Sequence, residues 1–444
     1  MTPSELASPD AAAERRVRRV SQIVIFVTVA VLAVGAAAQL GVIEELGTAA
    51  SPLVGEWEVT VRWWGLLAAV LACVAAVGLA PRLLTSRLPS AAVAALLYAG
   101  TVVLGLAVNL LRDGTGGWTR MFDLGPPPAS FEAPNEYLAG LPAVSYGTRF
   151  FLDRFAELVP SLPAHVAGHP PGPLLALHLL GIDSAAGLTA LCVGVGALCS
   201  PLAYRLAWTL HDEAAGRVAG LLCACSPLTL LFGVASYDYA FAGVTTAAVC
   251  ALIARRRAWW LVGAALLAAA SMLNWALLGA GAFAAIVVWR RDGWRSALLL
   301  AALCAAVLAA LNGVLAAAYG YDPIGTLRAT EQIYRDSIAQ YRPYWFWVLG
   351  SAVAWGVTLG PPIVLGVIRG AVARTPAAIA LVVVLGVATV GGFTKAETER
   401  IWLFLVPLAC AAAAPYLAPR QIRLVLGALL AQAVAMQVLM DTVW

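Results

Sequence analysis

The chain has 444 residues, of which 61% are hydrophobic and only 12% are charged. A soluble globular domain is about 25% charged, so about half of the usual surface charge is missing. This composition excludes a soluble enzyme and a disordered chain, and a net charge of +4 is too small for a nucleic-acid-binding surface. We therefore expect an all-α protein that crosses a membrane many times.

The chain starts with a polar segment, residues 1–20, which we expect to be a cytoplasmic tail. Four arginines at its end precede an apolar run from Ile23 to Leu40. This run is longer than the hydrophobic part of a signal peptide and no cleavage site follows it, so we expect a retained transmembrane helix. Residues 21–88 then contain two N-terminal transmembrane helices.

Apolar runs close to the length of a spanning helix, about 20 residues, recur along the whole chain. The thirteen runs lie near 21–40, 62–80, 89–111, 184–208, 216–236, 238–254, 258–275, 277–290, 296–319, 343–368, 376–393, 400–417 and 422–442. With the N-terminus in the cytoplasm, most of the 28 basic residues fall on the cytoplasmic side. This topology, N-in and C-out, requires that the short apolar segment 171–181 does not span, so we expect it to lie as a helix at the outer membrane surface.

Two predicted outer loops, 113–183 and 320–342, are longer than a connection between helices requires. Long connections in compact proteins usually carry function. We assign both loops to a transmembrane module at 89–342 and the remaining spans to a C-terminal module at 343–444. The chain contains no internal repeat of the kind that is common in transporters.

The first long loop carries Glu136 and closes with His169-Pro170-Pro171-Gly172, thirty-three residues later. An acid after a transmembrane helix, followed by His-Pro-Pro before an interfacial helix, resembles the C-superfamily of integral-membrane glycosyltransferases (GT-C). Similar members are the protein O-mannosyltransferases, the aminoarabinose transferases and the actinobacterial wall-assembly enzymes. The turn at 214–220 and the following Ser226-Pro227 also look like that family.

The resemblance covers about residues 89–340. The chain departs from the family in one respect, because Asn135-Glu136 replaces the usual Asp-Glu pair. The resemblance implies an inverting transfer of a hexose or pentose, such as mannose or arabinose, from a polyprenyl-phosphate donor. The acceptor would be a hydroxyl of an envelope lipid, polysaccharide or protein at the outer face of the plasma membrane. No cofactor is firmly implied, and a divalent cation remains an open alternative.

Such a transfer needs a carboxylate within hydrogen-bond reach of the attacking hydroxyl. We expect Glu136 to be this general base or its partner, although it could instead be a solvated loop acid. Asp123 and Glu132 are the alternatives for the base. Tyr137 and His165 are candidates for contact with the sugar or the acceptor.

The departing lipid phosphate needs preorganised cations. The resemblance implies a phosphate contact for His169, although the residue could simply precede a helix that starts at the two prolines. His165 and His169 are four residues apart, as metal ligands can be, but no third ligand follows at a suitable spacing. We therefore assign no metal site.

In the second loop, Arg328, Arg335 and Arg342 recur every seven residues, so a helix would align them in one stripe. Glu331 would pair with Arg335. We expect Arg335 and Arg342 to contact the donor phosphate; the alternative is contact with lipid headgroups.

Two further groups of charges lie at predicted outer helix ends. Asp238 could bind sugar hydroxyls or cap the following helix. In the segment 393–402, Lys395 and Arg400 are candidates for the donor phosphate and Glu399 for the sugar or acceptor, while Glu399 and Arg400 could also be a plain ion pair.

Two other functions remain open. A lipid-linked sugar flippase or transporter would need polar groups along a path through the membrane, but the predicted helices contain few beyond Asn109, Asn274 and Asn312. A non-catalytic envelope assembly subunit would contain no essential carboxylate.

Overall fold

The computed structural model describes residues 11–125 and 130–442. These residues are mostly helical, and their one sheet is an antiparallel pair of two-residue strands, so the all-α class is confirmed. The predicted tail lies outside the described residues as far as residue 10. From Ala11 onward it is helical and continues directly into the first apolar helix.

The first helices and the helices of the first long loop follow one another closely. They are α1 (Ala11–Gln39), α2 (Trp63–Thr85), α3 (Ser90–Asp113), η2 (Gly114–Trp118), η3 (Arg120–Phe122), η4 (Ala133–Asn135), α4 (Tyr137–Gly140), η5 (Leu141–Val144), α5 (Thr148–Asp153), α6 (Phe155–Leu158), η6 (Val159–Ser161), α7 (Ala164–Ala167) and α8 (Gly172–Leu180). The short helix expected at 171–181 is thus present as α8.

The rest of the chain forms the larger part of the bundle. Its middle elements are α9 (Ala185–Gly196), α10 (Cys199–Leu210), α11 (Glu213–Cys225), α12 (Pro227–Phe232), α13 (Tyr237–Leu252), α14 (Ala258–Leu273), η7 (Trp275–Leu277), α15 (Leu278–Asp292) and α16 (Trp294–Tyr319). The last elements are α17 (Pro323–Asp336), η8 (Ile338–Tyr341), α18 (Tyr344–Leu359), α19 (Pro361–Val372), α20 (Pro376–Gly391), α21 (Thr398–Ile401), η9 (Leu403–Leu405), α22 (Val406–Ala413), η10 (Ala414–Tyr416), η11 (Pro419–Gln421) and α23 (Ile422–Leu439). The strands are β1 (Glu56–Trp57) and β2 (Met440–Asp441).

Six helices of the described chain are long and apolar enough to cross a membrane, or seven if the pair α18 and α19 counts as one span. The predicted count of thirteen is not reached by this criterion, because many of the apolar helices are shorter than 18 residues. The predicted topology stays a prediction.

Proline residues explain two of the shorter helices. The run expected to be one helix at 216–236 ends at Ser226 and restarts at Pro227, and the run at 343–368 ends at Gly360 and restarts at Pro361. The residue before a proline avoids the helical conformation, so each helix stops there. The second break turns the chain by 113° between α18 and α19, so the run expected at 343–368 is a bent pair of helices rather than one continuous helix.

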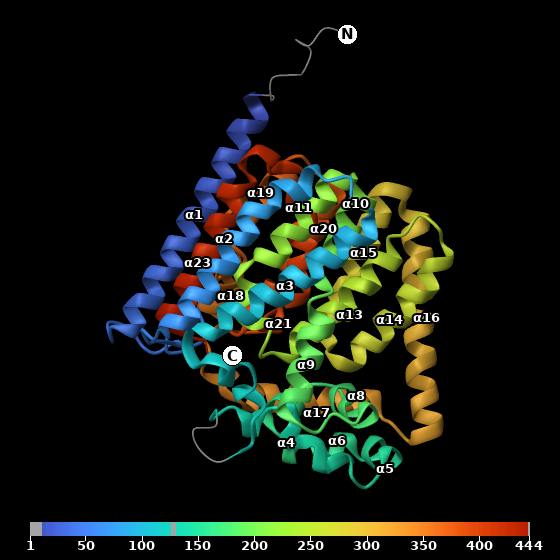
Figure 1. Ribbon diagram of the computed structural model, residues 1–444. Coiled ribbons are helices and arrows are strands. Elements are labelled where there is room, and N and C mark those ends of the chain that lie inside the picture. The colour runs from blue at the N-terminus through green and yellow to red at the C-terminus, as the bar shows by residue number, and fades with distance from the viewer. Residues whose placement is uncertain (1–10, 126–129, 443–444) are drawn as a thin grey trace.

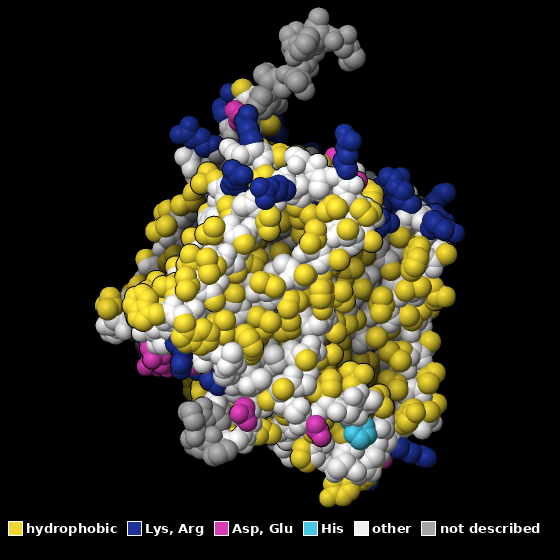
Figure 2. All heavy atoms as spheres, in the orientation of Figure 1, with side chains coloured by type: hydrophobic (Ala, Val, Ile, Leu, Met, Phe, Trp, Pro, Cys, Tyr) yellow, Lys and Arg dark blue, Asp and Glu magenta, His cyan; other side chains and the backbone are white. Residues whose placement is uncertain are grey.

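The helices pack as one bundle with the short loop helices gathered at one end (Figure 1). Helices α4, α5, α6, α8 and α17 lie together at the end opposite to the start of α1, so that the two long loops predicted from the sequence meet there. Figure 2 shows Lys and Arg side chains gathered mostly at the end where α1 starts. Apolar side chains cover the middle of this face, as expected for a surface in contact with lipid.

Candidate active site

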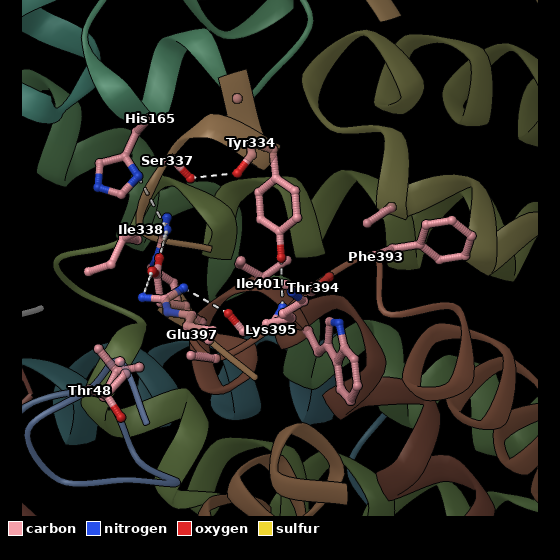
Figure 3. Close-up of a pocket in the computed structure, with 18 of the residues that line it drawn as sticks. Thr48, His165, Tyr334, Ser337, Ile338, Phe393, Thr394, Lys395, Glu397 and Ile401 are labelled. Carbon is pink, nitrogen blue, oxygen red and sulfur yellow. Dashed lines mark hydrogen bonds and ion pairs between the residues drawn. The ribbon is translucent and has the colours of Figure 1, made fainter. Parts of the chain in front are cut away.

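A cavity of about 1660 Å³ lies where the two long loops meet the apolar helices. Its apolar side is lined by Trp275, Ala276, Gly279, Ala282, Val383, Val384 and Val387. Its charged centre contains Glu132, His165, Arg342, Lys395, Glu397 and Arg400. Its remaining side includes residues 45–49 and 54–56, from the segment between α1 and α2. Figure 3 shows His165, Tyr334, Lys395 and Glu397 around the pocket, together with Thr48 of that segment.

A chain of ion pairs crosses the charged centre. Arg400 is 2% exposed, and its Nη1 lies 2.5 Å from Asp238 Oδ2 while its Nη2 lies 3.1 Å from Glu397 Oε2. Arg342 pairs with the other oxygen of Glu397 at 2.9 Å. Burial acts to raise the pKa of Glu397, but the two guanidinium groups outweigh it and lower this pKa to about 2. Glu397 therefore stays ionised and holds both arginines at the cavity.

The turn that presents Glu397 is strained. Ala396 and Glu397 have positive φ angles of 63° and 57°, a conformation that costs residues with a Cβ about 1–3 kcal/mol each. Arg342 stabilises this turn by donating from Nη1 to the Lys395 carbonyl at 2.7 Å, in addition to its bond with Glu397. The Lys395 backbone N–H also donates to the Tyr334 hydroxyl at 2.9 Å. Such strain is maintained where the surrounding contacts require it, and here those contacts come from the residues of the cavity.

His165, on α7, lies between Arg400 and two carboxylates. Its Nδ1 is 3.4 Å from Arg400 Nη2, and its Nε2 is 3.6 Å from Glu132 Oε2 and 3.9 Å from Glu136 Oε1. A guanidinium has no acceptor atom, so the contact with Arg400 requires a lone pair on Nδ1. Neutral His165 therefore carries its proton on Nε2, which faces the carboxylates. Burial acts to lower the pKa of His165, but the charge of Glu136 and the bond to Glu132 raise it overall.

The two carboxylates beside His165 differ in access to the cavity. Glu132 lines it, whereas Glu136 is 2% exposed and buried behind the histidine. The bond to His165 lowers the pKa of Glu132 despite partial burial, and Asn135 Nδ2 donates to the same carboxylate at 3.1 Å. Glu132 is thus an ionised carboxylate that a bound molecule can reach.

His169 is held through both ring nitrogens. Its Nδ1 lies 2.5 Å from the carbonyl oxygen of His165, which can only accept, so Nδ1 carries the proton. Its Nε2 then accepts from Asn274 Nδ2 at 3.1 Å. Burial lowers the pKa of His169 to about 4, so the ring is neutral at physiological pH. A phosphate contact through His169 would break one of these bonds; in this structure His169 positions His165.

Two predicted site residues lie apart from this cluster. Asp123 is exposed, and its carboxylate accepts the Gly125 backbone N–H at 2.9 Å. Arg335 is exposed and pairs with Glu331 at 2.5 Å, as its spacing predicts. The predicted single stripe of three arginines is wrong, because α17 ends at Asp336 and Arg342 is not on that helix. Ser337 ends it by adopting an extended backbone and capping η8 with its side chain.

Of the remaining predicted residues, three are buried and one is partly exposed. Asp238 is engaged by Arg400, and Ser236 caps α13 in its place. Tyr137 packs edge-on against the His169 ring, with 5.8 Å between ring centroids. Glu399 accepts the Val54 backbone N–H at 3.0 Å.

The partly exposed residue is Lys395. It lines the cavity, and its Nζ donates to the Ala339 carbonyl at 3.2 Å. The structure therefore brings together most of the predicted residues, although they come from four distant segments of the chain.

The sequence did not single out Glu397, Asn274 as a partner of His169, or the segment between α1 and α2. Asn274 had a detectable signal, because an amide at the end of an apolar run requires a partner. Glu397 could be recognised only from its neighbours in space. In the described part of the chain, no three His, Cys, Asp or Glu side chains are grouped so as to hold a metal ion.

Comparison with known proteins finds no family model, no characterised protein and no solved structure that matches the chain. The resemblance to the GT-C superfamily therefore remains a hypothesis that rests on the residues quoted for it.

Proposed function

We propose that this protein transfers a sugar from a polyprenyl-phosphate donor to a hydroxyl group of an envelope acceptor, at the outer face of the plasma membrane. The observation that carries this proposal is a single cavity that combines an apolar side, buried arginines and an accessible ionised carboxylate. A lipid-linked sugar phosphate has the matching parts: an apolar chain, an anionic phosphate and a sugar carbon open to attack.

The apolar side of the cavity suits the isoprenoid chain. Val383, Val387 and Phe393 line it and are 45%, 61% and 73% exposed. Apolar side chains this exposed on a membrane protein are in contact with lipid. A lipid chain could therefore lie along α20 while its phosphate reaches the charged centre.

The charged centre suits the phosphate. Arg342 is 6% exposed, lines the cavity, and its Nε has no hydrogen-bond partner among the described residues. Lys395 adds a positive charge beside it. Preorganised cations stabilise the negative charge that grows on a departing phosphate, and they act most strongly where water is excluded.

In the proposed step, the acceptor oxygen attacks the anomeric carbon, and the bond from that carbon to the phosphate oxygen breaks. The electron pair of this bond leaves with the phosphate, and the hydroxyl proton passes to Glu132. The products are a glycoside of inverted configuration and polyprenyl phosphate. Glu136 and His165 position Glu132 from the buried side.

The test uses the full-length protein in lipid nanodiscs with radiolabelled polyprenyl-phosphate mannose, arabinose or glucose and extracted envelope acceptors. We expect labelled product from the wild type and a loss of about 100-fold or more in Glu132→Gln. Asp123→Asn is the matched control, because it changes an exposed carboxylate of the same loop, and it should retain full activity.

Other outcomes distinguish the alternatives. Loss in Glu136→Gln with full activity in Glu132→Gln would assign the base to Glu136. Movement of the donor across the membrane without product would overturn the proposal in favour of a flippase. Full activity in both variants would exclude a catalytic role for this pair of carboxylates.

A further inference from the structure

One side of the cavity is built by a part of the chain that the GT-C resemblance does not cover. We call it the α1–α2 wall and define it as residues 45–49 and 54–56, which line the cavity between the first two helices of the described chain. The sequence suggested only two additional membrane helices here. The structure shows that their connection forms part of the candidate site.

The α1–α2 wall is held at several points. Trp347 Nε1 donates to the Leu46 carbonyl at 2.9 Å, and the Val54 backbone N–H donates to Glu399 at 3.0 Å. Strand β1 pairs with β2 near the other end of the chain. Residues 45–49 and residues 54–56 are both hydrogen-bonded to other elements. The α1–α2 wall is therefore held in one position.

The wall starts directly at the charged centre. A Cβ at Gly47 would lie 2.7 Å from Arg342 Cγ and 3.2 Å from the Tyr341 carbonyl oxygen, so the backbone lies against the arginine. The φ angle of Gly47 is +84°, which residues with a side chain rarely adopt. A molecule that lies along this wall would therefore contact the backbone beside Arg342.

The wall also carries charge of the opposite sign. Glu45 and Glu56 are exposed on it, and Asp441 lies beside them in the cavity lining. Two cations lie nearby and both are already paired: Arg120 with Asp113 at 2.8 Å and with Asp441 at 3.3 Å, and Arg112 with Glu58 at 2.6 Å and with Asp441 at 3.9 Å. Phe131, which also lines the cavity, is 74% exposed.

These carboxylates and the exposed Phe131 ring favour one chemical class of ligand. Carboxylates only accept hydrogen bonds and so suit hydroxyl groups, and an exposed ring offers an apolar face on which a sugar ring can pack. A second phosphate would meet charges of its own sign, which oppose its binding.

We propose that the α1–α2 wall is the acceptor subsite and that it takes the neutral, polyhydroxylated end of a saccharide rather than a phosphate-bearing acceptor. This inference rests on the proposed function, because it assumes that the donor phosphate occupies the charged centre. The acceptor hydroxyl then approaches Glu132 from the side opposite to the lipid chain.

The test separates acceptor binding from donor chemistry by measuring two reactions. One is transfer to a neutral mannose or arabinose oligosaccharide and to the same oligosaccharide with a terminal phosphate monoester. The other is slow hydrolysis of the donor, in which water is the acceptor.

The test variant carries both Glu45→Lys and Glu56→Lys. Glu44→Lys is the matched control, because Glu44 is exposed on the same segment but is not part of the cavity lining.

The wild type should prefer the neutral oligosaccharide by kcat/KM. The double variant should reduce this preference at least ten-fold, whereas Glu44→Lys should leave it unchanged, and all three proteins should hydrolyse the donor equally. An unchanged preference in the double variant, or a wild-type preference for the phosphorylated oligosaccharide, would overturn the acceptor subsite while donor hydrolysis persists. Absence of hydrolysis and transfer in the wild type would instead overturn the proposed function, and the subsite with it.

Discussion

Glu399 is a buried carboxyl group at the edge of the site. One of its oxygens accepts the Val54 N–H, and the other has no hydrogen-bond partner among the described residues. Burial raises its pKa to about 7. Between pH 4.5 and 7 the folded protein therefore retains a proton that the unfolded chain releases, so folding stability falls as the pH rises through this interval.

The raised pKa of Glu399 leads to a testable pH dependence. Protonation of Glu399 stabilises the folded protein fully below about pH 4.5, and this stabilisation is lost as the pH rises past about 7. The free energy of unfolding falls by about 3 kcal/mol in total over this interval. The melting temperature of the wild type in nanodiscs should fall between pH 5 and pH 8, and Glu399→Gln should flatten this fall. Glu44→Gln, at an exposed position, is the control. An equal slope in the wild type and Glu399→Gln would show that Glu399 is ionised throughout.

Residue types and local order in the sequence predicted most of the charged centre, including Glu132, His165, Arg342 and Arg400. The sequence did not distinguish these residues from Asp123 and Arg335, because it does not show which charged residues of a loop are buried and which are exposed. Exposure and partners depend on contacts between distant segments. The pairing of Glu397 with two arginines is a contact of this kind, since it requires the turn at 396–397 to be held by Arg342.

At the scale of elements, the break between α18 and α19 shapes the end of the bundle. Gly360 has a φ of +110°, and a Cβ there would overlap the Leu429 side chain on α23. Gly360→Ala should therefore strain the backbone and disturb the packing of α23, lowering the free energy of unfolding by about 2 kcal/mol or more. Because Gly360 is not in the cavity lining, the turnover of the folded fraction should be unchanged.

The melting temperature and the activity per folded molecule check this prediction for the break. Gly427→Ala is a suitable control, because a Cβ at Gly427 meets no atom within 4 Å. Equal melting temperatures in the two variants would show that the bundle accommodates a side chain at the break.

Helix positions were predictable from apolar runs, but their lengths were not. A run of apolar residues marks burial in lipid or protein, and it does not show where a helix stops. The stops at Ser226 and Gly360 follow from the prolines after them, which the sequence displays but which a count of apolar residues ignores. At the end of α17 the Ser337 hydroxyl donates to the Tyr334 carbonyl at 2.7 Å and accepts the Ala339 N–H at 3.4 Å, and a count of apolar residues does not reveal these contacts.

For the molecule as a whole, the positions of the few charged residues are more informative than their low number. Lys and Arg side chains gather mostly at the end where α1 starts (Figure 2), and the loop helices gather at the other end (Figure 1). The cavity is lined in part by residues of these loops. If the basic end faces the cytoplasm, the cavity lies at the outer surface with its apolar side toward the bilayer. That placement would bring a lipid-linked phosphate to the arginines without moving it through the protein.

The central claim is that a polyprenyl phosphate occupies this cavity, and photolabelling tests it most directly. The full-length protein in nanodiscs would be irradiated with a polyprenyl phosphate that carries a diazirine next to the phosphate, and labelled peptides would be mapped. We predict labelling within 323–342 and 393–401, competed by unmodified polyprenyl phosphate but not by uncharged polyprenol, and reduced in Arg342→Gln. Labelling elsewhere in the chain, or equal competition by polyprenol, would contradict the claim.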